Sequence, residues 1–273
     1  SICVILIGNT GCGKSSLLNS LTNRELIVSE YSSWNVMLKG PGIQSGSRSY
    51  TNVPNIVEDP NSGIFFCDCP GFDGTDDIIQ EIINSFAIDS LFSNISKKLK
   101  FKILLTVSES EYYASRGQHL VNCFNRLSQM FPNDEYLKST GLVITKCEKK
   151  LQKDDIIDLL ENYFDSNKSS IFQYFCSNPD DIFTFPMPDR SEIGQKYTFN
   201  DRQRIISFIQ KEQTCEIKHH ISLSESSYYY LKTMKNDLEG KTKEEIRNLF
   251  EKIYENYSKE NNENVLNNWK EKF

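Results

Sequence analysis

The sequence predicts an α/β fold in which a doubly wound, mostly parallel sheet is flanked by helices and followed by a C-terminal helical extension. Two observations support it. Short apolar runs rich in β-branched residues alternate with segments whose apolar residues recur at three- and four-residue spacing. After about residue 213 the strand signal ends and only helical periodicity remains. We therefore expect two domains, residues 1–212 and residues 213–273.

The first part of the chain is expected to hold a buried strand and a helix. Residues 2–7 form a short β-branched run, as a buried parallel strand does. Residues 15–21 then have helical spacing with three leucines facing inward. Residues 28–62 are polar and rich in Gly, Ser and Pro, so we interpret them as a loop with one edge strand at most.

Strands and helices then alternate, which implies βαβ units and a mostly parallel sheet. The expected strands are residues 64–68, 101–107, 142–146 and 182–185. The expected helices are residues 76–94, 117–130, 153–163 and 201–210.

The C-terminal part is expected to form two amphipathic helices. The first contains Leu231 and Met234 on one face and is expected to stop at Gly240. Thr242 followed by Glu245 is a capping-box pair that begins the second. Two interpretations remain open: the helices pack back on the preceding domain, or they form an arm for dimerisation or for an unknown protein partner.

Composition limits the classes of partner. The formal net charge of −6 gives no reason to expect a nucleic acid. Eight scattered cysteines fit reduced cytoplasmic thiols better than a disulfide framework. No run of 18 apolar residues occurs, so no transmembrane segment is expected. Because a strand begins at once and residue 1 is Ser, we expect the chain to be part of a longer protein.

A glycine-rich loop lies between the first expected strand and helix. Residues 8–15 read Gly-Asn-Thr-Gly-Cys-Gly-Lys-Ser, with the spacing of a phosphate-binding loop. Glycines let the backbone amides point at an anion, and the helix N-terminus adds positive potential. Lys14 is expected to reach the β- and γ-phosphates, and Ser15 to ligate Mg²⁺. The predicted phosphate-binding residues are Gly8, Asn9, Thr10, Gly11, Cys12, Gly13, Lys14, Ser15 and Ser16.

A second motif, Asp68-Cys69-Pro70-Gly71, closes the strand expected at residues 64–68. A carboxylate at the carboxyl end of a parallel strand lies in the crevice where doubly wound sheets bind ligands. Asp68 is therefore expected to hold Mg²⁺ through water, and Gly71 to offer its backbone N–H to a γ-phosphate. The loop that follows, residues 72–75, would respond to the presence of that phosphate.

A third motif, Thr145-Lys146-Cys147-Glu148, follows the strand expected at residues 142–146. A carboxylate here accepts two hydrogen bonds from the N1–H and exocyclic amine of guanine, and adenine has no matching donor pair. Losing a hydrogen bond to a charged group costs about 1.5–3 kcal/mol, or about ten- to a hundred-fold in affinity. Lys146 would lay its methylene stem on the purine. The alternative is that Lys146 and Glu148 only solvate a loop end.

With these motifs in order, the chain resembles the septin-like branch of the small G domains, and most of all the immunity-associated GTPases called GIMAP proteins and related protist P-loop proteins. The likeness spans about residues 1–210. The residues that carry it are Gly8-Asn9-Thr10-Gly11-Cys12-Gly13-Lys14-Ser15-Ser16 with Asn19-Ser20, Asp68-Cys69-Pro70-Gly71-Phe72-Asp73 and Thr145-Lys146-Cys147-Glu148.

The resemblance implies a P-loop NTPase fold that binds GTP or GDP with Mg²⁺ and changes conformation with the bound nucleotide. It also implies a homodimer across the nucleotide face. In that family a Thr of the first switch loop ligates Mg²⁺ in the GTP state, and Thr51 is our candidate, with Ser47 and Ser49 as neighbouring rivals. Lys14 and Thr51 are thus the expected catalytic residues.

The sequence departs from the pattern of the family in several places. After Gly71, many G domains carry a Gln that orients the attacking water, and this chain has Phe72. The GIMAP relatives have an Arg soon after the fourth strand, and residues 108–112 contain none. Arg48 and Arg116 are candidates for an arginine finger, or else they are surface charges. The base motif usually ends in Asp rather than Glu.

Three functions follow from these patterns. The first is a GTPase of low intrinsic rate that switches or assembles with nucleotide state. The second is a non-hydrolysing GTP- or GDP-bound scaffold, which Phe72 favours. The third is an ATP-binding P-loop protein, which the altered base motif at Glu148 leaves open.

Overall fold

The computed structural model describes residues 2–32, 35–41, 43, 54–72, 78–95, 100–113, 117–131, 133–149, 151–167, 169–211, 219–239, 245 and 248. The chain divides into two compact units, residues 1–222 and residues 223–273. The domain boundary expected after residue 212 stays a prediction.

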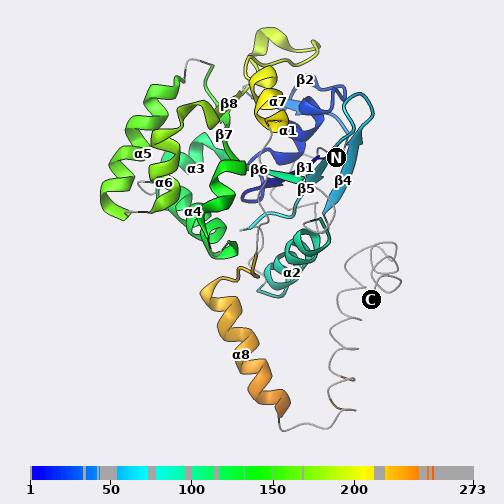
Figure 1. Cartoon of the computed structure of the whole chain (residues 1–273). Helices are drawn as coiled ribbons and strands as arrows, with labels where there is room; N and C mark the ends of the chain where they lie inside the picture. Colours follow the sequence, from blue (N-terminus) through cyan, green and yellow to red (C-terminus); the bar gives the residue numbers. More distant parts are fainter. Residues whose placement is uncertain are drawn as a thin grey trace. The chain divides into compact units, whose positions relative to one another are not determined.

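The first unit is built on a six-stranded sheet in the order β4-β5-β1-β6-β7-β8 (Figure 1). All neighbouring pairs are parallel except β4 and β5. β4 and β5 lie on one side of β1, and β6, β7 and β8 lie on the other. The strand order therefore changes side at β1, which makes this position the topological switch point of the sheet. The strands are β1 (Ile2–Ile7), β4 (Asn55–Asp59), β5 (Ile64–Asp68), β6 (Lys100–Ser108), β7 (Thr140–Cys147) and β8 (Ile182–Pro186).

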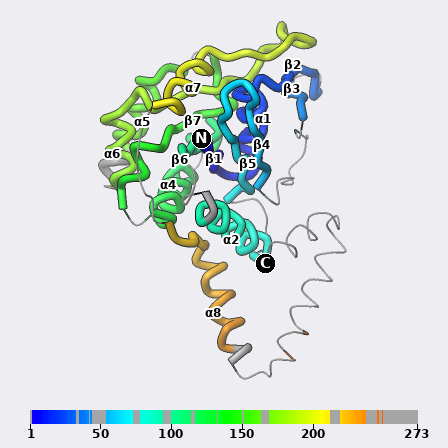
Figure 2. Tube along the Cα trace, turned by 45° about the vertical axis from the view of Figure 1, so that its right-hand side comes forward, coloured from blue at the N-terminus to red at the C-terminus, as the bar shows by residue number. Residues whose placement is uncertain are grey.

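Helices cover both faces of this sheet (Figure 2). Val4 and Leu6 of β1 face one apolar layer with α1 (Lys14–Leu21) and α7 (Arg202–Gln210). Ile5 and Ile7 face the opposite layer. The helices of that layer are α2 (Ile78–Ile95), α4 (Gln118–Met130), α5 (Lys153–Asn167) and α6 (Ser170–Ser177). The alternation along β1 follows from the two-residue period of a strand.

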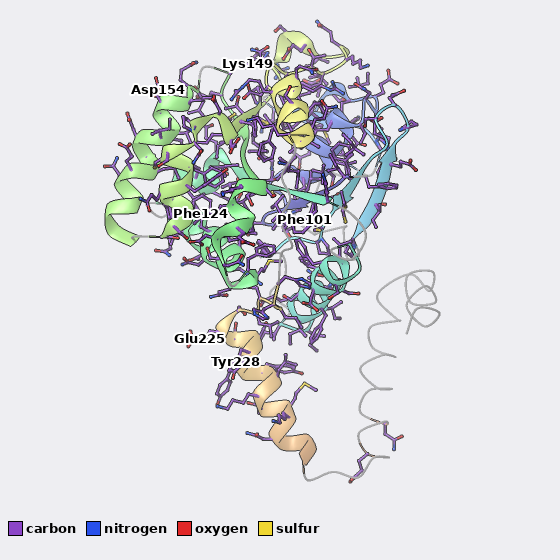
Figure 3. The ribbon with its side chains drawn as sticks, in the orientation of Figure 1. Phe101, Phe124, Lys149, Asp154, Glu225 and Tyr228 are labelled. Atoms are coloured by element: carbon purple, nitrogen blue, oxygen red, sulfur yellow. The ribbon has the colours of Figure 1, made fainter. Side chains whose placement is uncertain are left out.

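Aromatic side chains fill the second layer. Phe124 of α4, labelled in Figure 3, packs against Phe172 and Phe175 of α6 with ring centroids 4.6 and 5.8 Å away. A short helix, α3 (Glu109–Tyr113), follows β6, and its Tyr112 is fully buried and donates to the carbonyl of Ile156 at 2.5 Å. Within the described residues, 3-10 turns lie at Asp134–Ser139, Pro179–Asp181 and Arg190–Glu192.

The expected α/β fold is confirmed, and the expected strands and helices lie within a few residues of the observed ones. The expectation of at most one edge strand in residues 28–62 is wrong. Besides β4, this region contributes to a two-stranded antiparallel sheet of β2 (Ile27–Glu30) and β3 (Val36–Lys39). The segment around β2 also bonds to a distant part of the chain, since Val28 donates to the carbonyl of Gln195 and Tyr197 to that of Leu26. Local composition carries no sign of such pairing.

The second unit contains α8 (Glu225–Glu239), in the region where the sequence predicts the first C-terminal helix. Glu225 and Tyr228 mark its first turn (Figure 3). The hydroxyl of Ser224 accepts the N–H of Ser227 at 3.1 Å, which caps the helix N-terminus. The second predicted helix, after Thr242, lies almost wholly outside the described residues. In the part of the chain that the structure describes, no helix combines the length and hydropathy that crossing a bilayer requires.

Candidate nucleotide-binding site

The loop between β1 and α1 is the centre of the site, and its glycines are required by its shape. Gly11 and Gly13 have φ angles of 76° and 98°, in the left-handed region that side chains disfavour. Gly8 has φ 153°, and a Cβ there would lie 2.0 Å from the carbonyl oxygen of Thr106 on β6. The sheet therefore approaches the loop so closely that only glycine fits at position 8.

Lys14, the first residue of α1, points back into this loop. Its side chain is buried, and Nζ donates to the carbonyls of Gly8 at 3.0 Å and Asn9 at 2.8 Å. The ammonium group is thus held in the middle of the loop beside the N-terminus of α1, whose N-cap, Gly13, has no side chain to cap the helix. A buried cation beside a helix N-terminus favours the binding of an anion.

Ser15 and Asp68 bring two oxygen ligands together from distant parts of the sequence. The Ser15 hydroxyl donates to Asp68 Oδ2 at 2.5 Å. Asp68 is buried at the carboxyl end of β5, where it is in register with Leu6 of β1. A hydroxyl and a carboxylate are the donor types that Mg²⁺ prefers when phosphate oxygens and water supply the rest. Among the described residues, no three His, Cys, Asp or Glu side chains gather into a fuller metal site.

The segment after Asp68 lies directly on the phosphate loop. A Cβ at Gly71 would lie 2.2 Å from Thr10 Oγ1 and 2.4 Å from Thr10 N, so only glycine fits there. The next residue, Phe72, donates its backbone N–H to the carbonyl of Gly8 at 3.2 Å. Gly71 and Phe72 therefore pack directly on residues 8 and 10 of the loop.

Phe72 is held away from solvent by Arg126 of α4, a residue that the sequence analysis missed. Arg126 Nη1 donates to the Phe72 carbonyl at 2.9 Å, and the guanidinium lies 4.9 Å from the centre of the Phe72 ring. Arg126 Nη2 also pairs with Glu81 of α2 at 2.9 Å. Residues 126 and 72 are far apart in sequence, so no local pattern signals this contact.

The base motif reaches the phosphate loop through Thr145. Its buried hydroxyl donates to the carbonyl of Cys12. The strand then bulges between Thr145 and Cys147, and Lys146 has φ 53°. The bulge leaves the side chains of Lys146 and Glu148 exposed while Cys147 stays buried.

The loop after β8, which the sequence did not allow us to assign, lies beside the base motif. Met187 donates its backbone N–H to the carbonyl of Cys147 at 2.9 Å. Lys149, labelled in Figure 3, pairs with Asp189 and Glu192, both at 2.8 Å. These partners raise the pKa of Lys149, and Lys149 lowers the pKa of Glu192. The sequence did contain one signal for this contact, because the loop follows the carboxyl end of the last strand.

Helix α3, which the sequence did not predict, connects the phosphate loop with the base motif. Glu111 accepts the side-chain amide of Asn9 at 2.8 Å and the N–H of Ser108 at 2.8 Å. Glu109 accepts the N–H of Glu148 at 3.3 Å. One short helix therefore contacts the phosphate loop through one carboxylate and the base motif through another.

The remaining predicted residues fall into two groups. Cys12 is buried in the phosphate loop, and burial raises the pKa of its thiol despite the nearby Lys14, which favours an unreactive thiol. All seven cysteines in the described part of the chain are free. Thr51, Ser47, Ser49, Arg48 and Arg116 lie outside the described residues.

Comparison with protein families gives a match over residues 3–146 to the model described as 50S ribosome-binding GTPase. Comparison with curated proteins gives no match.

Several solved structures are similar to the chain. A probable GTP-binding protein engB is 16% identical, with a TM-score of 0.43 over 77% of this chain and 99% of that one. A variant of Era from Aquifex aeolicus bound to GDP.AlF4- is 14% identical, with a TM-score of 0.41 over 80% of this chain and 61% of that one. The signal recognition particle receptor SRb-GTP/SRX complex from Chaetomium thermophilum is 16% identical, with a TM-score of 0.36 over 68% of this chain and 88% of that one.

Proposed function

Because the chain belongs to this GTPase family, we propose that it binds GTP or GDP with Mg²⁺ at residues 8–16, hydrolyses GTP slowly, and changes the conformation of the segment after Asp68 with the bound nucleotide. The observation that carries the proposal is the geometry of the phosphate side. Lys14 is fixed in the loop, Ser15 and Asp68 form one oxygen pair, and Gly71 lies against Thr10.

Each side chain has a separate role in the proposal. Lys14 and the loop amides bind the phosphates, and Gly71 donates to the γ-phosphate. Ser15 and Asp68 hold Mg²⁺, which neutralises charge on the phosphate oxygens. Thr145 and Lys146 bind the base, and Glu148 selects guanine over adenine. Thr51 as the additional Mg²⁺ ligand of the GTP state remains part of the proposal.

Slow hydrolysis follows from Phe72. A hydrocarbon ring cannot orient water, and this ring is buried under Arg126. The same observation favours the second candidate, a scaffold that binds the nucleotide without turnover. A third, ATP binding, rests on the altered base motif alone.

Four finer points belong to the proposal. The resemblance to the septin-like GIMAP branch suggests a homodimer across the nucleotide face. The C-terminal helices, residues 213–273, would then be available to a protein partner. The free thiols suit a cytoplasmic location. No nucleic acid is expected as a partner.

Phosphate release from GTP over a range of protein concentrations tests the function. We expect turnover on the order of 10⁻⁴ s⁻¹, the scale of an unassisted GTPase, and its loss when EDTA removes Mg²⁺. A rate per molecule that rises with concentration would support a dimer that completes the site. No turnover at any concentration would reject the enzyme and favour the scaffold.

A further inference from the structure

One buried hydroxyl in the phosphate loop has no hydrogen-bond partner. Thr10 Oγ1 is shielded from solvent and bonds to none of the residues that the structure describes. Two other hydroxyls at the site are used: Ser15 donates to Asp68, and Thr145 to the carbonyl of Cys12. Buried polar groups are nearly always paired, so the exception at Thr10 requires an explanation.

The position of Thr10 suggests what the missing partner is. A Cβ on Gly71 would lie 2.2 Å from Thr10 Oγ1, so the hydroxyl lies where the phosphate loop meets the segment after Asp68. In the proposed function the γ-phosphate binds between these two segments, with Lys14 behind it. On the same proposal, the two GDP phosphates would bind deeper in the loop and would not need this contact.

Neighbouring side chains leave this role to Thr10. Phe72 offers no donor, and its ring and carbonyl are both held by Arg126. Asn9 donates its side-chain amide to Glu111 and is turned toward α3. Thr10 is β-branched, so few rotamers compete with the one that presents the hydroxyl to the ligand.

We propose that the Thr10 hydroxyl is a γ-phosphate ligand: it donates a hydrogen bond to a γ-phosphate oxygen and so strengthens the binding of GTP relative to GDP. This inference rests on the proposed function and adds to it a side chain that distinguishes the two nucleotides. The contact forms when the segment at Gly71 moves to admit the phosphate.

The test is Thr10→Val, which replaces the hydroxyl by a methyl group of similar size. We expect the affinity for a non-hydrolysable GTP analogue to fall about ten-fold, as for a hydrogen bond to a charged group. Affinity for GDP should stay within about two-fold. Thr10→Ser keeps the hydroxyl and should restore the GTP/GDP ratio. Thr22→Val is the matched control, because that buried hydroxyl, at the C-cap of α1, donates to the Leu18 carbonyl at 2.9 Å.

Two results would overturn the inference while the proposed function stands. One is that Thr10→Val leaves the affinities for both nucleotides unchanged. The other is an equal loss for both nucleotides, which would mean that the hydroxyl only shapes the loop. If the wild-type chain binds neither nucleotide, the proposed function fails and this inference fails with it.

Discussion

The two halves of the site differ in how their side chains are held. On the phosphate side, Lys14 and Asp68 are only 6% and 5% exposed. Lys14 donates to carbonyls of the loop, and Asp68 accepts from Ser15 of α1. On the base side, Lys146 and Glu148 are exposed at a bulge, and the nearby Lys149 pairs with carboxylates at the surface.

We therefore expect the phosphate side to determine the affinity for nucleotides and the base side to determine the selectivity between them. Charges that are shielded from water interact more strongly than charges in solvent. The buried phosphate side should therefore supply most of the binding free energy for any nucleotide. The exposed base side should add a smaller increment that depends on the identity of the base. Substitutions on the two sides should therefore have different effects on nucleotide binding.

The largest effect is expected at Lys14. We predict that Lys14→Ala lowers affinity for GTP, GDP and ATP alike by about a hundred- to a thousand-fold, because the loop loses its only buried ammonium and several charged hydrogen bonds. Equilibrium binding of labelled nucleotides measures it. Lys149→Ala is the matched control on the base side and should cost no more than a few-fold, as exposed ion pairs contribute little. An equal loss of affinity in the two variants would contradict the difference between the phosphate side and the base side.

A smaller and selective effect is expected at Glu148. Glu148→Ala should weaken GTP by about ten-fold and leave ATP unchanged, since only guanine offers the donor pair. Competition between the two nucleotides reads out the ratio. Glu58→Ala, an exposed carboxylate on the edge strand β4, serves as the control. An unchanged GTP/ATP ratio would place base selection elsewhere.

Thr145 joins the two sides, so its loss should affect both. Thr145→Val removes the hydrogen bond to the Cys12 carbonyl and should weaken GTP and ATP by a similar factor of about two to ten. Separate titrations with GTP and with ATP show whether the loss of affinity affects both nucleotides or only GTP. A loss confined to GTP would make Thr145 a base-reading residue only.

The smallest effect concerns pH. Burial raises the pKa of Cys3 in β1 and of Cys147 in β7 from 9.0 to about 12. The folded state therefore keeps these protons longer than the unfolded chain, so stability is full below about pH 9 and falls as pH rises toward 12. Urea unfolding at about pH 8 and about pH 10.5 measures how steeply the free energy of unfolding falls with pH. Cys3→Ala and Cys147→Ala should each flatten it, and a wild-type slope of zero would contradict the burial argument.

The sequence indicated the loop of residues 8–15 because the signals for it are local. The glycines and Lys14 occur within eight residues, between a β-branched run and a helical run, and the structure places them in one loop. Asp68 was predictable from its position at the end of an apolar strand. The fold followed from the same alternation of strands and helices.

What the sequence did not predict depends on contacts between distant residues. The Phe72–Arg126 contact and the Asn9–Glu111 bond join residues from different elements, and neither has a spacing that marks it. The β2–β3 sheet and its bonds to residues 195–197 were missed for the same reason. The roles of the site residues remain predictions until nucleotides are bound.

The most direct test of the central claim is displacement of a fluorescent GDP analogue from the wild-type chain in the presence of Mg²⁺. The account predicts that GTP and GDP displace it at concentrations at least about ten-fold lower than ATP. Equal potency of ATP and GTP would contradict guanine selection by Glu148, and failure of the analogue to bind at all would contradict the nucleotide site itself.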